Sequence, residues 1–319
     1  MRFSVITPVY NRADCVARCI ESVVRNLQWG IEIEHVIVDD GSKDDTASIV
    51  SSYAAKYPHI HFIKFEKNRG TNAARNAAIA AAKADWCIIL DSDDYFLDTA
   101  LRDIEATMKE LPSYRHYMFA PDDMQGEYEK NSLLHGEKHK ELTYLDFLSG
   151  RVGGDFIHVC NTAILRKYPF REEIRIQEGI FFLQFFREAQ RMLFTNIVVT
   201  IRERSREDSV TRETIRTNDT IIKRCIMGTT LQLQYFANDY QRYGLTHILR
   251  SLQVSLLDNL LLLGRYDEAK SLLTQMGASA SKKESLLKLI ASCHCGWAYK
   301  LALRFFLWTK YHILHTTIK

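Results

Sequence analysis

Two clusters of aspartates are the residues in this sequence best suited to chemistry. The pair Asp39–Asp40 and the stretch Asp91–Asp94 each follow a short apolar run. Carboxylates placed this close repel one another unless a cation binds them. Hard divalent cations prefer such oxygen ligands and commonly share them with substrate phosphates. The clusters therefore predict a site for a metal ion and a diphosphate.

The scaffold that must position these clusters is visible in the first 120 residues. Helical spacing around residues 14–27, 44–57, 71–84 and 97–111 separates β-type apolar runs, namely FSVITPV, HVIVDD, IHFIKF, WCIILDSDD and HYMFAPDD. Such alternation predicts a largely parallel sheet with helices on both faces. Ligands of these sheets bind outside the carboxyl ends of the strands, which is where both aspartate clusters fall.

The rest of the chain divides at a polar stretch. Residues 126–199 are less regular, with helical patterns at 144–148 and 178–190 and a strand pattern at 193–202. From Asn218 onward the pattern is helical, with a hairpin jointed at Gly264. The charged segment 205–217 separates the two parts. We therefore expect a catalytic domain over residues 1–212 and a helical region over residues 213–319.

Two common nucleotide-binding motifs are absent from the sequence. No GxGxxG follows the first strand, and no GxxxxGK[ST] occurs anywhere. These motifs hold phosphates with a glycine-rich backbone. A nucleotide is therefore expected to be held by side chains and a metal ion.

Four segments in the same order and at the same spacing resemble the inverting family 2 glycosyltransferases of GT-A fold. They are VITPVYN, VDDGSKDDT, NRGTNAARNAAI and IILDSDD. The resemblance is close over residues 2–95 and looser out to about residue 212. It implies an α/β fold of GT-A type, with a mostly parallel central sheet flanked by helices. The pattern after Asn218 adds an all-helical C-terminal appendage. The resemblance also implies metal-dependent, inverting transfer of a sugar from a nucleotide sugar, expected to be UDP-linked. The acceptor would be a hydroxyl of a lipopolysaccharide, capsule or exopolysaccharide, either lipid-linked or an oligosaccharide.

The resemblance implies a donor pocket built from five residues. Pro8 and Tyr10 would line the pocket for the base, and Asp40 would accept a hydrogen bond from it. Arg69 and Arg75 would lie by the nucleotide. Ordinary packing at a strand end is the alternative for Tyr10, and a salt bridge to an acid is the alternative for Arg75.

The same resemblance implies a metal site in the second cluster. Asp93 would bind Mn²⁺ or Mg²⁺ at the diphosphate, Asp91 would lie near the ribose or sugar and share the metal, and Asp94 would assist. The cation would neutralise charge on the leaving nucleoside diphosphate. Asp39 is expected to stabilise a turn instead.

At the position of the catalytic base the sequence departs from the pattern of the family. The family commonly uses the Asp of a Glu-Asp pair at the start of a helix, but here Gly179 follows Glu178. Glu178 could itself be the base, Asp155 could replace it, or the protein could have lost activity. A negative residue favoured by the dipole of the helix is the structural alternative for Glu178.

Residues 202–212 resemble the basic loop that follows the last strand in many relatives. Arg202, Arg206 and Arg212 are candidates to close over the diphosphate, because guanidinium groups suit phosphate oxygens. A solvated linker is the alternative. His158, in the apolar stretch FIHVCN, is expected to be a core or acceptor-side histidine.

The charge is unevenly distributed along the chain. The net charge of +3 is too small to indicate a nucleic-acid binder, but residues 282–319 carry seven Lys or Arg and one Glu. That segment has a charge of +6, and the residues before it have −3. Within it, four apolar residues recur near helical spacing: Trp297, Leu301, Phe305 and Trp308. A basic amphipathic helix of this kind predicts an anionic membrane surface as partner. The alternative is packing of the apolar side onto preceding helices.

The sequence also carries signals of compartment. A strand pattern begins almost at Met1, without the pattern of a signal peptide, and the seven cysteines are scattered. No apolar stretch is long enough to span a bilayer. We expect a cytoplasmic protein, peripheral at the inner face of the plasma membrane.

Overall fold

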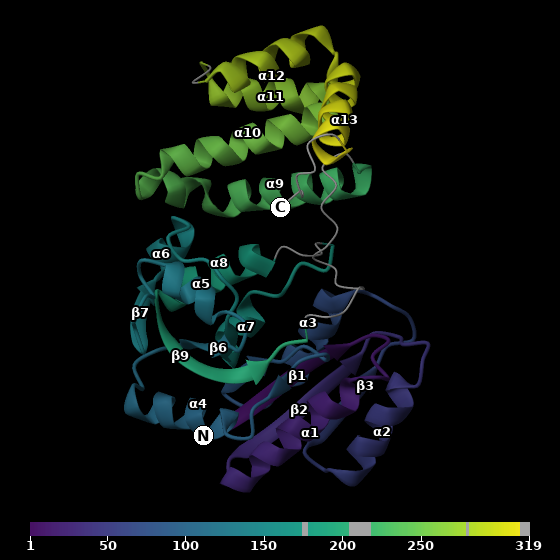
Figure 1. Cartoon of the computed structure of the whole chain (residues 1–319), viewed down its shortest axis with the longest axis vertical. Coiled ribbons are helices and arrows are strands. Elements are labelled where there is room, and N and C mark those ends of the chain that lie inside the picture. Colours follow the sequence, from purple (N-terminus) through teal and green to yellow (C-terminus); the bar gives the residue numbers. More distant parts are fainter. Residues whose placement is uncertain (174–177, 204–217, 279–280, 313–319) are drawn as a thin grey trace. The chain divides into compact units, whose positions relative to one another are not determined.

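The structure is a computed structural model that describes residues 1–173, 178–203, 218–278 and 281–312 (Figure 1). The side chains of residues 178, 307 and 310–312 are outside this description. The chain divides into two compact units, Met1–Glu207 and Asp208–Lys319.

The first unit contains a parallel sheet built from the segments with the strongest β pattern. In spatial order its strands are β3 (Ile60–Lys64), β2 (Glu32–Asp39), β1 (Arg2–Val9) and β4 (Trp86–Ile89). After their first residue, β1 and β2 are buried throughout. This burial explains their near-continuous apolar sequences, because both faces of the sheet are covered.

The sheet continues beyond β4 with strands of both directions. An antiparallel strand, β8 (Ile157–Asn161), separates β4 from β6 (His116–Pro121). β6 pairs in parallel with β9 (Arg191–Ile201). The long β9 then pairs antiparallel with β5 (Tyr95–Phe96) and β7 (His139–Thr143). The expected largely parallel α/β sheet is confirmed, and the insertion of β8 was not predicted.

Helices and one 3₁₀ turn connect these strands. They are α1 (Val16–Asn26), η1 (Leu27–Trp29), α2 (Thr46–Lys56), α3 (Thr71–Ala81), α4 (Ala100–Glu110), α5 (Gln125–Lys130), α6 (Tyr144–Leu148), α7 (Thr162–Lys167) and α8 (Glu178–Ala189). The buried face of α1 carries Cys19, Ile20 and Val23, at helical spacing. Because Ile20 packs with Val9 and Ile37, this helix lies directly against the strands that end at the aspartates.

The second unit is helical over its described residues. Its helices are α9 (Asp219–Arg242), α10 (Thr246–Leu262), α11 (Tyr266–Met276), α12 (Lys282–Cys293) and α13 (Gly296–His312). Gly264 joins α10 to α11 with a φ of +70°, so the predicted hairpin joint is confirmed. Leu257, Leu261 and Leu287 are among the most buried side chains of the core that these helices share.

A buried ion pair fixes three of these helices. Arg250 of α10 donates from Nε to Glu284 of α12 at 3.2 Å, and Glu284 is 3% exposed. Arg250 also donates to the carbonyl oxygens of Met276, at the end of α11, and Ala278. The guanidinium therefore links α10 to the end of α11 and to the buried carboxylate of α12.

Two further expectations concern membranes and cysteines. Among the described helices, none is both long and apolar enough to cross a membrane. All seven cysteines lie within the described ranges and are free thiols.

Candidate active site

The carboxyl ends of β1, β2 and β4 lie side by side because β1 pairs with both neighbours. In register, Val9 is opposite Asp39 and Ile6 is opposite Ile89. The loops that follow these strands therefore start from one edge of the sheet. The two aspartate clusters lie on this edge, as expected from the rule that ligands bind there.

The first cluster organises the loops beside it. The Oδ1 atom of Asp40 accepts the backbone N–H of Arg69 at 2.6 Å, and its Oδ2 accepts that of Gly70 at 2.9 Å. Asp39 accepts the backbone N–H of Ser42 at 3.2 Å, which confirms its expected turn role. The buried carboxylate of Asp40 thus ties the end of β2 to the loop before α3. Its contact with a base stays a prediction.

Gly41 allows the same two loops to touch. Its φ is +74°, and a Cβ atom there would lie 2.7 Å from the carbonyl carbon of Lys67. Both the backbone conformation and the close approach therefore require glycine. The glycine of the VDDGS segment is explained by this contact.

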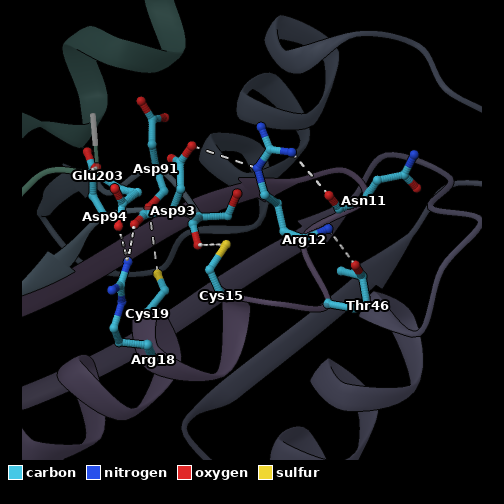
Figure 2. Close-up of polar contacts among 12 residues, drawn as sticks. Asn11, Arg12, Cys15, Arg18, Cys19, Thr46, Asp91, Asp93, Asp94 and Glu203 are labelled. Atoms are coloured by element: carbon cyan, nitrogen blue, oxygen red, sulfur yellow. Dashed lines mark hydrogen bonds and ion pairs between the residues drawn. The ribbon is translucent and has the colours of Figure 1, made fainter. Parts of the chain in front are cut away.

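The loop after β1 is fixed to the loop after β2. The backbone N–H of Asn11 donates to Ser42 Oγ at 2.9 Å, and Asn11 Oδ1 accepts the N–H of Lys43 at 2.9 Å. The N–H of Arg12 donates to Thr46 Oγ1 at 2.7 Å (Figure 2). These bonds give the residues just before them, Pro8 and Tyr10, a fixed place at the edge of the sheet.

The second cluster is surrounded by arginines. Figure 2 shows Asp91, Asp93 and Asp94 gathered on the loop after β4. Arg75 of α3 lies 3.0 Å from Asp91, measured from Nη2 to Oδ1. Arg12 Nε lies 3.7 Å from Asp93 Oδ2. The salt-bridge alternative for Arg75 is therefore observed, and its partner is itself a predicted site residue.

Helix α1 holds the backbone of this loop. Arg18 donates from Nη2 to the carbonyl oxygen of Asp93 at 3.1 Å. The thiols of Cys15 and Cys19 donate to the carbonyl oxygens of Ser92 and Asp91, each at 3.7 Å (Figure 2). Cys15, Arg18 and Cys19 were not predicted to serve the site. Their spacing of three and four residues places them on one side of the helix, which is the signal that could have found them.

The pKa of Asp94 is raised by burial and by repulsion from the other carboxylates of the cluster. Burial and then the charges of Asp91 and Asp93 raise this pKa from 3.8 to about 8. One compensating contact is the backbone N–H of Glu203, which donates to Asp94 Oδ1 at 3.1 Å. Without a further cation, ionisation of all three carboxylates at neutral pH is unfavourable, and Asp94 is the one that keeps its proton.

The donor set of the cluster fits a hard divalent cation. Its members are carboxylates, and their mutual repulsion is what a cation would relieve. Within the described residues, no group of three or more His, Cys, Asp or Glu side chains is arranged to hold a metal by itself. A cation here would therefore need oxygens from a substrate as well, as Mg²⁺ commonly does.

The asparagines of NRGTNAARNAAI secure α3 to a distant segment. Asn72 donates to the carbonyl oxygen of Arg171 at 2.9 Å. Asn76 donates to the carbonyl oxygen of Phe170 at 2.8 Å and accepts its N–H at 2.9 Å. The guanidinium of Arg75 lies over the ring of Phe170, 5.5 Å from its centroid. The motif thus positions Arg75 as well as supplying it.

Arg69 lies nearer the surface than Arg75. Its guanidinium pairs with Glu172 at 3.2 Å and lies over the ring of Phe65. Its side chain is 50% exposed, against 11% for Arg75. Arg69 is therefore the more adaptable of the two arginines, and its role by the nucleotide stays a prediction.

Asp155 is engaged by an arginine that was itself a candidate. Arg202 Nη1 lies 2.8 Å from Asp155 Oδ2, and Arg202 Nε donates to Asp123 at 2.7 Å. Burial acts to lower the pKa of the Arg202 guanidinium, but its two carboxylate partners, Asp155 and Asp123, outweigh burial and raise the pKa. In this arrangement Arg202 joins two acidic loops, and its closing over the diphosphate stays a prediction.

The remaining candidates for the base and for the diphosphate are only partly described. Glu178 is the first residue of α8, which agrees with the expected helix start, but its side chain lies outside the described residues. Arg206 and Arg212 also lie outside them. Gly179 has no neighbouring atom within 4 Å of the position of a Cβ. The aspartate commonly found here would therefore fit.

His158 is partly buried between the sheet and α8, which fits the expected core or acceptor-side histidine. Its Nδ1 lies 2.9 Å from Nε2 of His116, and its ring stacks on Phe182 of α8 at 4.0 Å between centroids. Burial lowers the pKa of His158 to about 3, so the ring is neutral. The pair links the sheet to α8 four residues after the start of that helix.

A family model and curated proteins resemble this chain in sequence. The model of glycosyl transferase family 2 matches residues 4–172. ExoO of Rhizobium meliloti, a succinoglycan biosynthesis protein, is 41% identical over 97 residues, which cover 30% of this chain and 27% of that protein. A GalNAc(5)-diNAcBac-PP-undecaprenol beta-1,3-glucosyltransferase of Campylobacter jejuni is 27% identical over 213 residues, covering 66% of this chain and 67% of the other. The chain thus matches only about a quarter of the length of ExoO.

Solved structures share the fold. TarS of S. aureus, residues 1–349 in complex with UDP-GlcNAc, has a TM-score of 0.63 at 20% identity and covers 94% of this chain and 90% of that one. The mannosyltransferase PcManGT of Pyrobaculum calidifontis, in complex with GDP-Man and Mn²⁺, has a TM-score of 0.54 at 16% identity. It covers 97% of this chain and 86% of the other. At these identities the likeness concerns the fold alone.

Proposed function

The chain belongs to glycosyl transferase family 2, and from that membership we propose a metal-dependent, inverting transfer of a sugar from a nucleotide sugar to a hydroxyl group. The observation that carries this proposal is the cluster of Asp91, Asp93 and Asp94 at the joined ends of β1, β2 and β4. Burial and the charges of Asp91 and Asp93 raise the pKa of Asp94, which supports the binding of a cation at that place. A cation shared with a diphosphate would supply it.

The donor is proposed to be a UDP-sugar held along the edge of the sheet. Pro8 and Tyr10 would contact the base, and Asp40 would accept a hydrogen bond from it. Arg75 is already placed by Asp91 and by Phe170, so its guanidinium would meet a nucleotide without much loss of conformational entropy. Arg69 and Arg206 would add charge at the phosphates. The UDP-GlcNAc complex of TarS supports this choice of donor.

Asp93 and Asp91 are proposed as the ligands of Mn²⁺ or Mg²⁺. The cation would supply neutralisation of charge on the leaving nucleoside diphosphate. Arg12 and Arg75, the ion-pair partners of these aspartates, would set the positions of the carboxylates. The Mn²⁺ complex of PcManGT supports a divalent ion in this fold.

Glu178 is proposed as the base that takes the proton of the acceptor hydroxyl. Asp155 would have to give up its contact with Arg202 to perform this step, which is the reason to prefer Glu178. The position of Glu178 at the start of α8 places it on the segment that His158 and Phe182 secure.

The acceptor is proposed to be a growing bacterial surface glycan carried on a lipid. The undecaprenol in the name of the Campylobacter relative supports a lipid-linked acceptor, and the succinoglycan role of ExoO supports polysaccharide synthesis. Such acceptors would place the enzyme in the cytoplasm, at the inner face of the plasma membrane.

Calorimetric titration of the full chain with UDP, with and without Mn²⁺, tests the donor site. We expect Mn²⁺ to strengthen UDP binding in the wild type and not in Asp93→Ala. Asp98→Ala is the matched control, because Asp98 lies a few residues further along the chain, after β5, and pairs with Arg25 at an exposed place. Metal-dependent binding that survives in Asp93→Ala would show that Asp93 is not a ligand.

A panel of sugar nucleotides, read by released UDP or GDP, tests the reaction itself. We expect release to depend on Mn²⁺ and to be greatest with one UDP-sugar. The presence of Gly179 favours one rival, a family member that binds nucleotide or glycan without turnover. Nucleotide binding without release, with acceptor present, would favour that rival. Release of pyrophosphate from a nucleoside triphosphate would indicate a nucleotidyltransferase instead.

A further inference from the structure

Helix α13 exposes its largest apolar side chains. Besides Phe306 at 59%, which lies on another side of the helix, four of these described side chains are more than half exposed: Trp297 at 67%, Leu301 at 54%, Phe305 at 69% and Trp308 at 53%. Their spacing of four, four and three residues places them on one face of the helix. A different face, with Tyr299 and Leu303, packs into the core of the helical unit. The sequence left open whether the apolar face packs onto preceding helices, and the structure shows that it does not.

An exposed face of this kind indicates a binding surface. Single exposed apolar residues are ordinary, but contiguous aromatic and aliphatic side chains on a folded domain mark sites of interaction. We call the face formed by Trp297, Leu301, Phe305 and Trp308 the aromatic face of α13.

The charge of α13 favours an anionic partner. The helix contains Lys300, Arg304 and Lys310 and no acidic residue. On a helical wheel, Lys300 and Arg304 lie beside the aromatic face. Lys300 also forms an ion pair with Asp219 of α9, which anchors the helix to its unit. A second copy of the chain, apposed through the same helix, would bring positive charges together.

The two tryptophans favour a lipid surface in particular. Trp297 and Trp308 lie near opposite ends of the aromatic face, three turns apart. Tryptophan rings prefer the boundary between headgroups and acyl chains. A helix with aromatic residues on one face and basic residues at its border binds in the plane of that boundary.

We propose that the aromatic face of α13 inserts into the headgroup region of an anionic bilayer, with the exposed Arg304 against lipid headgroups. This inference rests on the proposed function only for the choice of compartment. It would place the unit that follows the catalytic one on the surface that carries a lipid-linked acceptor.

Co-sedimentation of the full chain with vesicles tests the surface. We expect binding to vesicles of phosphatidylcholine with phosphatidylglycerol, and weaker binding to phosphatidylcholine alone. Leu301→Ser/Phe305→Ser should lower partitioning by about tenfold or more, because two apolar anchors are lost. Arg304→Gln should lower it by about fivefold. The matched control is Trp29→Ser/Met227→Ser, which removes two exposed apolar side chains elsewhere and should bind like the wild type.

Fluorescence quenching by brominated lipids tests insertion. Trp297→Phe/Trp308→Phe keeps the face apolar, so we expect this variant to bind vesicles while losing most of the quenching seen in the wild type. Circular dichroism and UDP release without vesicles check that each variant is folded and active, which separates this test from that of the reaction.

Three results would overturn the proposal. One is wild-type chain that stays in the supernatant with anionic vesicles. Another is equal loss of binding in the control variant. The third is an oligomer in solution that Leu301→Ser/Phe305→Ser converts to a monomer, which would assign the aromatic face to a second copy.

Discussion

The guanidinium of Arg75 lies 3.0 Å from the carboxylate of Asp91, although the two residues belong to different motifs. Arg75 comes from α3 and Asp91 from the loop after β4. Their contact joins the NRGTNAARNAAI segment to the acidic cluster. The first prediction concerns this pair.

Replacing Arg75 with Gln should weaken UDP binding by about tenfold or more. A hydrogen bond to a charged group contributes about 1.5–3 kcal/mol, and this guanidinium is 11% exposed. Affinity for Mn²⁺ alone should not fall, since a positive charge beside the site is removed. Calorimetry measures both affinities. Arg25→Gln, which breaks an exposed pair with Asp98, is the control, and an equal effect there would remove Arg75 from the donor site.

Replacing Glu178 with Gln should lower kcat by about 10²–10⁴-fold, because the acceptor hydroxyl would lose its base. The KM for the donor should change little, since the base does not hold the nucleotide. Asp155→Asn should have a smaller effect on kcat, because this carboxylate is held by Arg202. Steady-state kinetics of the two variants decide whether Glu178 or Asp155 is the base. A larger fall in Asp155→Asn would reverse the assignment.

Replacing Gly41 with Ala should lower the melting temperature and weaken UDP binding. The new Cβ would meet the backbone of Lys67 at 2.7 Å, in addition to the strain of a φ of +74°. Gly30 has a similar φ of +69°, but no atom lies within 4 Å of the position of its Cβ. Gly30→Ala should therefore lower the free energy of unfolding by only about 1 kcal/mol. Thermal unfolding of both variants separates strain from collision. Equal melting temperatures would show that the loops move apart easily.

Buried histidines should make the protein sensitive to acid. Burial lowers the pKa of His35 to about 3, whereas the unfolded chain titrates near 6.5. The contribution of the neutral ring to stability is therefore complete above pH 6.5 and is lost as pH falls from 6.5 toward 3. The loss is about 1.4 kcal/mol per pH unit within that window.

Urea unfolding at pH 7 and pH 5 measures this loss. His35→Gln, which can keep a bond to Thr7, should show a smaller drop than the wild type. His135→Gln, at an exposed position, should show the same drop as the wild type. Identical drops in all three proteins would mean that His35 does not contribute.

Replacing Arg250 with Met should destabilise the helical unit by about 3 kcal/mol or more. Glu284 would remain as a buried carboxylate without its cation. Arg265→Met removes an exposed pair with Glu268 and should cost less than about 1 kcal/mol. Hydrogen exchange over α10–α12, followed by mass spectrometry, measures the difference within this unit. Equal protection in both variants would contradict the assigned role.

Much of the first unit was predictable because its signals are local. The apolar runs that became β1–β4 and β6 and the alanine-rich α3 each follow from residues near in sequence, as does the hairpin at Gly264 in the second unit. The strand β8 was not predicted, because its antiparallel place between β4 and β6 depends on pairing with segments far along the chain. Short helices such as α5 and α7 carry too few residues to establish a period.

The kind of chemistry could be inferred from the chain's residues alone, because acidic residues come directly after apolar strands. The partners of these residues depend on how the chain folds. Arg75 meets Asp91, Arg202 holds Asp155, and the thiols of Cys15 and Cys19 bind the loop of Asp91. The spacing of the apolar residues of α13 could likewise be predicted from the sequence, but their exposure to solvent could not. The physical reason is the same in each case: the residue type and its spacing are local, whereas burial and ion pairing depend on segments that folding brings together.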